Sequence, residues 1–322
     1  VALVGWVVLR YAKTYLQGEA GQGAFTATTL WTLGAVLALV SAGSLLVLVA
    51  AFAAVGSGIG RLLLFYPGRP AAQRAERKMM LVARAGDAAL VLAAMLLWGG
   101  YGTADIATIG ASATPAPAMA LWGAAFLALA AVLKSAQFPA HGWLTEVMEA
   151  PTPVSALLHA GVINAGGFLL LRFSPVMEAA PGAMAALVML GGFTALFGGL
   201  VMLTQPAVKT ALAWSTVAQM GFMILQCGLG LWALALLHIV AHSLYKAHAF
   251  LASGGAVEAV AAARRPGPVA VPGIAGVARA FAVALALYAA VATGFALLID
   301  EKAPQTLALG AILVFGVAYL LA

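Results

Sequence analysis

The sequence has few charged residues for its length. Only 8% of its 322 residues are Asp, Glu, Lys or Arg, whereas 64% are hydrophobic. Soluble domains usually carry about 25% charged residues, so the composition excludes an ordinary soluble fold. Apolar runs of about 20 residues recur along the chain, and each is long enough to cross a bilayer. The sequence therefore predicts an all-α polytopic membrane protein.

Cysteine and the common nucleotide and metal motifs are also scarce. Cys227 is the only cysteine, which excludes an intrachain disulfide and an iron–sulfur cluster built from this chain alone. The sequence contains no Walker loop, no GxGxxG before a helix and no HExxH. The net charge of +6 lies in connections between apolar runs and forms no patch with aromatic residues. We therefore expect no cofactor, no metal and no nucleic acid.

The hydropathy pattern predicts an opening helical piece that ends near Arg10, followed by ten full or broken spans, about eleven in all. The ten spans are Phe25–Val40, Ser44–Tyr66, Met79–Trp98, Ala118–Ser135, Thr152–Phe173, Ala183–Leu203, Thr210–Cys227, Leu231–Ser253, Gly276–Ile299 and Thr306–Ala322. The chain opens in the middle of a helix and without Met, so we expect an N-terminal part to be missing.

The charged residues in the connections give the orientation of these spans. The bases share one side of the topology: Arg10, Lys13, Arg69, Arg74, Arg77, Lys78, Arg264 and Arg265. The other side carries mainly acids, among them Asp105 and Glu178, with Arg172 as an exception. Because basic connections stay in the cytoplasm, we expect a multi-pass protein of a bacterial cytoplasmic membrane, surrounded by lipid.

No soluble domain is indicated. We expect a transmembrane core over residues 1–255, a Pro/Gly-rich cytoplasmic loop over 256–273 that contains "RRPGPVAVPG", and peripheral C-terminal helices over 274–322.

The segment "KSAQFPAHGWLTEVMEAPTPVSALLHAG" combines ionisable residues with helix-breaking prolines. Lys134 lies five residues before Pro139, and a proline frees a backbone carbonyl in the preceding turn. Lys134 is therefore either a lysine that extends to the membrane interface or a titratable amine in an ion path. His159 is either a hydrogen-bonded core residue or a member of the same path. Glu146 and Glu149 are expected to solvate the connector.

A second set of ionisable residues lies in "HIVAHSLYKAHAFL". His238, His242 and Lys246 are spaced at i, i+4 and i+8, so all three follow one helical stripe, and His248 lies off it. Histidine titrates near neutrality and is suited to proton transfer. Polar packing between helices and a zinc site are the alternatives, although no third zinc ligand of clear spacing is present.

Two further ionisable residues lie near helix ends. Lys209 follows a proline break in "LTQPAVK" and is either an interfacial lysine or part of the ion path. Asp87 lies three residues after Arg84, so the two side chains are predicted to form a local ion pair.

The two motifs above, together with "VKTALAWSTVAQMGF", resemble the antiporter-like membrane subunits of respiratory complex I and of multisubunit cation/proton antiporters. The resemblance extends to about Gly255. Within that superfamily, "HGWLTEVMEAPTPVSALLHAGVINAGGFLLLRF" and "CGLGLWALALLHIVAHSLYKAHAFL" are most similar to DabB-type proteins. The resemblance implies an antiporter-like bundle with two inverted repeats and broken helices.

The resemblance also implies roles for individual residues. The positions that match the ion path of the family are Asp87, Lys134, His159, Lys209, His242 and Lys246, with His238 on the same stripe. One departure concerns the partner of the central lysine. Complex I relatives carry a glutamate at a position that aligns near Ala53, but the segment "LLVLVAAFAAVGSGIG" contains no acid. Lys134 therefore lacks the carboxylate that the resemblance leads us to expect.

The resemblance implies a subunit that conducts H⁺ or Na⁺ and has no catalytic chemistry of its own. DabB-type proteins are the membrane partners of a zinc-containing, carbonic-anhydrase-like subunit in bacterial inorganic-carbon uptake. We therefore expect the ion gradient to be coupled to the uptake of CO2 or bicarbonate by such a partner. The alternatives are a proton-pumping complex I or multisubunit antiporter subunit, and a membrane anchor that conducts no ions.

Overall fold

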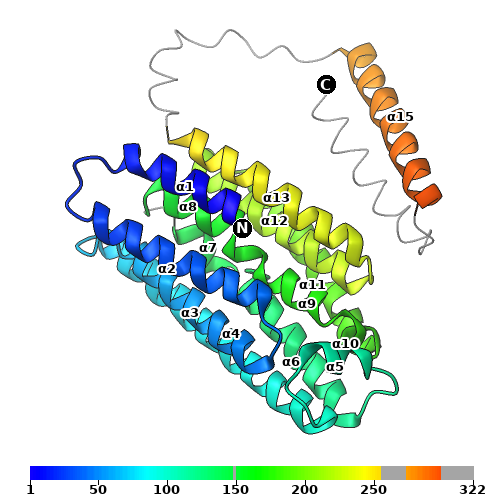
Figure 1. Ribbon diagram of the computed structural model, residues 1–322. Coiled ribbons are helices and arrows are strands. Elements are labelled where there is room, and N and C mark those ends of the chain that lie inside the picture. The colour runs from blue at the N-terminus through cyan, green and yellow to red at the C-terminus, as the bar shows by residue number, and fades with distance from the viewer. Residues whose placement is uncertain (148–149, 255–272, 299–322) are drawn as a thin grey trace. The chain divides into compact units, whose positions relative to one another are not determined.

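A computed structural model describes residues 1–147, 150–254 and 273–298 (Figure 1). Within these ranges every regular element is a helix, apart from one isolated β-bridge between Ser44 and Asp105. The chain divides into two compact units, Val1–Ala256 and Val257–Ala322. The predicted all-α architecture is confirmed for this part of the chain.

The first unit contains the helices α1 (Ala2–Tyr15), α2 (Gln22–Ser41), α3 (Leu45–Leu63), α4 (Pro70–Tyr101), α5 (Ile106–Ala111), α6 (Ala118–Lys134), α7 (Gly142–Glu146), α8 (Thr152–Ala160), the 3₁₀ helix η2 (Val162–Asn164), α9 (Ala165–Arg172), α10 (Ser174–Glu178), α11 (Pro181–Met202), α12 (Val208–Gly228) and α13 (Trp232–Ser253). In the second unit the structure describes α15 (Ile274–Leu298).

Seven helical segments among the described residues are long and apolar enough to cross a membrane. They are Gln22–Ser41, Leu45–Leu63, Pro70–Tyr101, Thr152–Arg172, Pro181–Met202, Val208–Gly228 and Trp232–Ser253. α6 is apolar but shorter, with 17 residues. The chain is therefore a multi-pass membrane protein. The predicted span Thr306–Ala322, the loop 256–272 and Glu149 lie outside the described residues.

Two helices extend further than the hydropathy pattern predicts. The opening helix continues past Arg10 to Tyr15, and α4 begins at Pro70 rather than at Met79. The 32 residues of α4 span about 48 Å, which exceeds the roughly 30 Å thickness of the hydrocarbon core. Its first turns, which carry most of the bases of their connection, therefore extend beyond the hydrocarbon.

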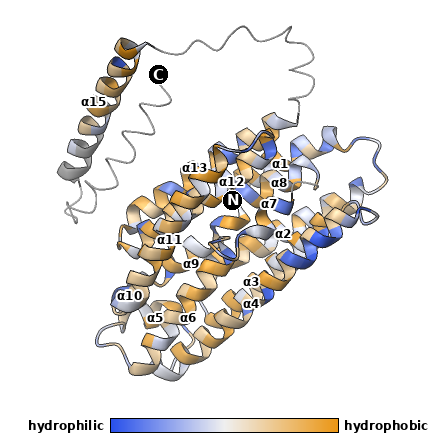
Figure 2. Ribbon diagram, turned by 180° about the vertical axis from the view of Figure 1, so that it is seen from behind, coloured by the Kyte–Doolittle hydropathy of each residue, from blue (hydrophilic) through white to orange (hydrophobic). Residues whose placement is uncertain are grey.

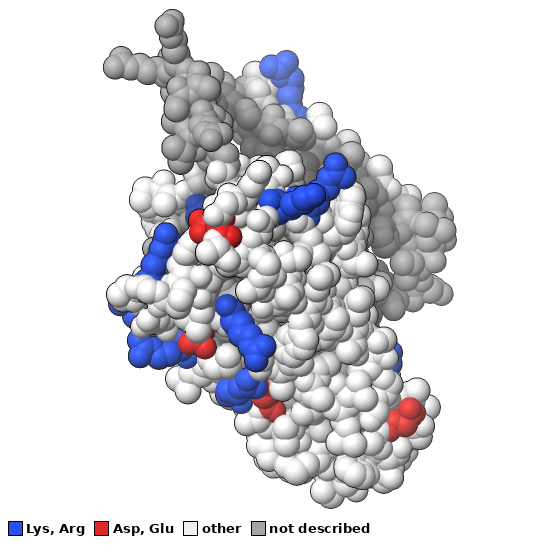
Figure 3. Space-filling model, turned by 60° about the vertical axis from the view of Figure 1, so that its left-hand side comes forward, with Lys and Arg blue, Asp and Glu red and all other residues white. Residues whose placement is uncertain are grey.

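The surface of the first unit matches a lipid environment. Many large apolar side chains are exposed, such as Leu81, Met189 and Leu196. Figure 2 shows hydrophobic colour over most of the helices and hydrophilic segments mainly at helix ends and loops. In Figure 3 several Lys and Arg side chains stand close together on a surface that is otherwise mostly uncharged.

The chain leaves the helical conformation directly after Lys134. Ala136 has a φ of 48°, a left-handed value that ends α6, and the chain then turns into the short helix α7. Two contacts hold this connector. The backbone N–H of Phe138 donates to Thr194 Oγ1 of α11 at 3.2 Å, and Glu146 forms an ion pair with Lys78 of α4. The connector that contains the predicted break near Pro139 is therefore held in place by contacts with α4 and α11.

A second break interrupts the span Thr152–Arg172. α8 ends at Ala160, and a 3₁₀ turn at Val162–Asn164 precedes α9. The side chain of Asn164 replaces a missing backbone donor, because its Nδ2 donates to the Ala160 carbonyl at 3.0 Å. The same amide donates to Ser243 Oγ of α13 at 3.2 Å. The side-chain amide of Asn164 at this break therefore contacts α13.

α11 and α12 pack closely along glycines. A Cβ atom added at Gly198 would lie 2.8 Å from the backbone nitrogen of Ala218, so only glycine allows this approach of the two backbones. The next residue, Gly199, has no atom within 4 Å of such a Cβ. The two neighbours therefore offer a matched test of helix packing.

We expect Gly198→Ala to lower the free energy of unfolding by about 1–3 kcal/mol, because the added methyl group forces the two helices apart. Gly199→Ala should leave stability unchanged or raise it by up to ~1 kcal/mol, because alanine is the better helix former. Thermal unfolding of the purified protein in detergent measures both effects. Equal melting temperatures for the two variants would contradict the observed packing.

Candidate functional site

Lys134 forms an ion pair with Asp87 inside the helical bundle. Its Nζ donates to Asp87 Oδ1 at 2.5 Å, and the two side chains are only 8% and 12% exposed. The other carboxylate oxygen of Asp87 accepts a hydrogen bond from Arg84 Nη1 at 2.9 Å. The ion pair between Arg84 and Asp87 is predicted from their spacing, but the contact with Lys134 is not. We call Arg84, Asp87 and Lys134 the charged triad.

The triad provides Lys134 with a carboxylate partner, although α3 has no acid near Ala53. α3 contributes no carboxylate there, but the aromatic ring of Phe52 lies 4.7 Å from Lys134 Nζ. Arg84 Nη2 donates to Ser57 Oγ at 2.8 Å, and that hydroxyl donates to the Ala53 carbonyl at 2.9 Å. α3 therefore contacts both bases through an aromatic ring and a hydroxyl, while α4 supplies the counter-charge of Lys134.

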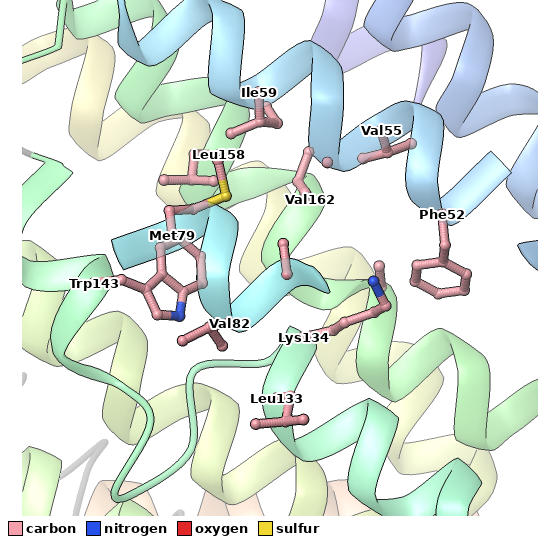
Figure 4. A pocket seen from close by; sticks show the side chains of 13 residues that line it. Phe52, Val55, Ile59, Met79, Val82, Leu133, Lys134, Trp143, Leu158 and Val162 are labelled. Atoms are coloured by element: carbon pink, nitrogen blue, oxygen red, sulfur yellow. The ribbon is translucent and has the colours of Figure 1, made fainter. Parts of the chain in front are cut away.

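A small cavity of about 50 Å³ lies beside Lys134 (Figure 4). Of the described residues that line it, Lys134 alone carries a charge, and most of the others are apolar. Trp143 of α7 lies on another side, and its buried indole Nε1 has no hydrogen-bond partner among the described residues. The volume is large enough to hold water, because a cavity of about 10–15 Å³ already admits one molecule.

His159 of α8 does not line this cavity. Its neighbour Leu158 lines the cavity, whereas His159 Nδ1 lies 3.0 Å from Thr216 Oγ1 of α12. Thr216 donates its own proton to the Leu212 carbonyl, so Nδ1 of His159 is assigned as the donor. Nε2 is then an acceptor, and it has no hydrogen-bond partner among the described residues. The imidazole stacks on the ring of Phe250 at 4.3 Å.

Lys246 meets the same carbonyl from α13. Its Nζ donates to the Leu212 carbonyl at 3.1 Å and to Ser215 Oγ at 2.8 Å. Lys246 is fully buried and has no carboxylate partner among the described residues. His159 and Lys246, which are 87 positions apart in the sequence, are thus linked through Thr216 and one carbonyl of α12.

The predicted stripe on α13 is confirmed. The rings of His238 and His242 lie 5.9 Å apart, and His242 and Lys246 are buried. His238 Nδ1 donates to Gln226 Oε1 at 2.9 Å. Nε2 of His238 and both ring nitrogens of His242 have no partner among the described residues. We call His159, His238, His242 and Lys246, with Ser215 and Thr216, the histidine cluster.

Lys209 joins neither group. It is half-buried at the second position of α12, and no hydrogen bond or ion pair of its side chain is found in the described part of the chain. Those residues also contain no group of three His, Cys, Asp or Glu side chains that could hold a metal ion. The sequence interpretation missed Ser57, Ser215, Thr216 and Gln226, because isolated hydroxyl and amide side chains in apolar helices give no spacing signal.

Buried lysines beside broken helices, together with a histidine stripe, define an antiporter-like membrane subunit. The chain belongs to the family described as "NADH:quinone oxidoreductase/Mrp antiporter, TM", which matches residues 42–287. The resemblance to this superfamily is therefore confirmed.

Two relatives of the chain within this superfamily are named as subunits of inorganic carbon transporters. The chain is 48% identical to the "probable inorganic carbon transporter subunit DabB2" of Halothiobacillus neapolitanus, over 79% of this chain and 47% of the relative. It is 43% identical to the "probable inorganic carbon transporter subunit DabB" of Hydrogenovibrio crunogenus, over 80% of this chain and 51% of the relative. The chain thus spans about half the length of these relatives, and its resemblance to DabB-type proteins is confirmed.

A solved structure shares the fold. The Mrp complex from a Dietzia species superposes with a TM-score of 0.76 at 31% identity, over 90% of this chain and 32% of the matched chain. That structure is a multisubunit complex, so this chain resembles a component of a larger membrane assembly.

We expect Asp87→Asn to lower the free energy of unfolding by about 3–5 kcal/mol, because two bases then lose their buried counter-charge. The substitution keeps the side-chain volume, so the loss reports charge rather than packing. Thermal unfolding in detergent measures it.

Asp105→Asn is the matched control. Asp105 caps α5 by accepting hydrogen bonds from the backbone N–H of Thr108 at 2.8 Å and from its hydroxyl at 2.7 Å. These bonds lower the pKa of the exposed Asp105 carboxyl. Asparagine is an equally good N-cap, so stability should change little. Equal losses in the two variants would argue against a stabilising triad.

Proposed function

We propose that this chain is part of an ion-translocating membrane subunit that couples a gradient of H⁺ or Na⁺ to the uptake of inorganic carbon by a partner. The observation that carries the proposal is the burial of two lysines, Lys134 and Lys246, next to groups that can exchange protons. Ionisable groups at bilayer depth are costly, and they commonly mark ion pathways.

The charged triad supports proton exchange at Lys134. When Lys134 releases its proton, Asp87 remains paired with Arg84, so the carboxylate keeps a counter-charge in both states. The cavity beside Lys134 has room for the water molecule that would accept this proton. The absent acid of α3 is then unnecessary for compensation, because Asp87 supplies the counter-charge of Lys134.

The histidine cluster supports the continuation of the path. Thr216 and the Leu212 carbonyl connect His159 with Lys246, and the rings of His238 and His242 extend the series along α13. His159, His238 and His242 each keep a ring nitrogen without a partner among the described residues, and such a nitrogen can receive a proton. In our proposal these residues pass charge between two half-channels. Lys209, at the start of α12, lies at an entrance of this proposed path.

We also propose the finer architecture that the family resemblance implies. It consists of about eleven spans with two inverted repeats, a core over residues 1–255, a cytoplasmic loop over 256–273 and peripheral helices over 274–322. The breaks after Lys134 and at Gly161 support it, because discontinuous helices mark ion sites in inverted-repeat transporters. We assign the protein to a bacterial cytoplasmic membrane, in agreement with its basic connections.

Ion flux in proteoliposomes tests conduction by the full-length protein in its complex. We expect Lys134→Ala and Lys246→Ala each to reduce flux at least ~10-fold, because each removes a titratable group from the path. Lys13→Ala removes an exposed base near the end of α1 and should leave flux unchanged. Unchanged flux in both core variants would overturn conduction and favour a membrane anchor that only holds helices together.

The composition of the purified complex tests the coupling. The names of two relatives refer to an inorganic carbon transporter. We therefore expect a soluble zinc-containing, carbonic-anhydrase-like protein to copurify, with zinc detected by elemental mass spectrometry. The zinc should remain with the soluble protein after the two subunits are separated. Copurification of NADH- and quinone-linked subunits instead would contradict this proposal and favour a complex I component.

A further inference from the structure

α4 is longer than a membrane span requires, and the surplus lies at its N-terminal end. Trp98 and Tyr101, near its C-terminal end, mark one membrane interface, where aromatic side chains are enriched. About 20 residues cross the hydrocarbon core, so the span extends from Tyr101 back to about Val82. Residues 70–81 add about 18 Å, and a tilt of about 20° would shorten the whole helix by only about 3 Å. A headgroup layer is about 5–8 Å thick, so the first turns of α4 extend about 7–10 Å beyond it.

The outward face of these first turns is basic. Four residues on it are exposed and none is an acid: Gln73, Arg74, Arg77 and Lys78. We call them the basic face of α4. The side chain of Arg74 is 63% exposed and that of Lys78 is 52% exposed. Glu76 lies on another side of the same turns, where it is half-buried near Gly60 of α3.

The basic face belongs to a segment whose position is fixed. Ala72, Ala75 and Met79, on the opposite side of the helix, are buried. Gln73 Nε2 donates to the Pro67 carbonyl at 2.7 Å, which joins the helix to the turn before it. The backbone that carries the bases therefore needs no further ordering when a partner binds, and this lowers the cost of association.

The charges on the basic face do not balance among the described residues. Glu146 of α7 pairs with Lys78, and its second oxygen lies 4.0 Å from Arg74 Nε. Arg77 Nε donates to the backbone carbonyl of Gln73 at 3.3 Å, and no ion pair of Arg77 is found in the described part of the chain. Three bases against one carboxylate leave two net positive charges on an exposed surface. Such a surface attracts and favours an acidic partner.

We propose that the basic face of α4 is the contact surface for an acidic patch of a soluble cytoplasmic subunit. The inference rests on the proposed function, in which a soluble zinc-containing protein is the partner, and it adds where that partner binds. Lipid phosphates can contact Lys78 at the level of the headgroups, but Gln73 and Arg74 extend beyond that layer. The positive-inside rule accounts for bases beside a span. It requires neither a helical extension nor bases beyond the headgroups.

Site-specific photocrosslinking in the purified complex tests this contact. The full-length protein is produced in its own host with benzoylphenylalanine in place of Gln73, so that all three bases are kept. The matched control carries the same probe in place of Gln17, an exposed glutamine between α1 and α2 on the same side of the membrane. After irradiation, mass spectrometry identifies the protein or lipid that is joined to each probe, and elemental mass spectrometry measures its zinc.

We expect the Gln73 probe to cross-link to the soluble zinc-containing protein with at least ~10-fold higher yield than the Gln17 probe. The cross-linked peptide should be rich in Asp and Glu. Cross-links only to phospholipid, only to this chain or only to another membrane-embedded subunit would overturn the proposal, and so would equal yields at the two positions.

Charge reversal measures the electrostatic part of the contact. Arg77→Glu should reduce recovery of the soluble protein with the membrane subunit at least ~10-fold, which corresponds to about 1.4 kcal/mol of association free energy. Lys13→Glu changes the charge of an exposed base on the same side by the same amount, so it controls for effects on membrane orientation, and recovery should be kept. Equal recovery in the two variants would contradict the contact.

These measurements separate the interface from the proposed function. If the wild-type complex contains the zinc protein but the Gln73 and Arg77 variants behave like their controls, the contact surface is wrong and the coupling proposal is unaffected. If the wild-type complex contains no such protein, the coupling proposal fails and the interface fails with it.

Discussion

The rest of the site depends on the ion pair between Lys134 and Asp87. An ammonium group among apolar helices is tolerated only with a counter-charge or water beside it. α4 supplies that counter-charge, and α6 ends at Lys134, so the lysine stands at the end of a helix where the chain can turn. Because Arg84 holds the second oxygen of the same carboxylate, the position of Asp87 is fixed from two sides.

The two buried lysines are stabilised in different ways. Lys134 has a carboxylate partner, whereas Lys246 is held by a backbone carbonyl and a hydroxyl of α12. An ion pair favours the charged form of a lysine, while neutral acceptors compensate burial less completely. The chain therefore offers two buried amines with different environments.

The broken helices connect these two environments. Glu146 fixes the connector after α6 to Lys78 of α4, and Phe138 fixes it to α11. At the second break Asn164 compensates the free carbonyl of Ala160 and reaches Ser243 of α13. Each break exposes backbone groups inside the bundle; Thr194 of α11 compensates one such group at the first break, and Asn164, at the second break itself, compensates another. Irregular backbone at membrane depth is possible only with such compensation.

The sequence by itself determined the membrane class, the positions of most described helices, the stripe on α13 and the ion pair between Arg84 and Asp87. All of these follow from hydropathy or from the 3.6-residue period, which act over short distances along the chain. The tertiary structure alone decided that Asp87 faces Lys134 and that His159 reaches Thr216, across 47 and 57 positions. It also decided the break at Gly161, where no proline marks the site. These contacts depend on how the helices rotate and pack against one another, and no local pattern records that rotation.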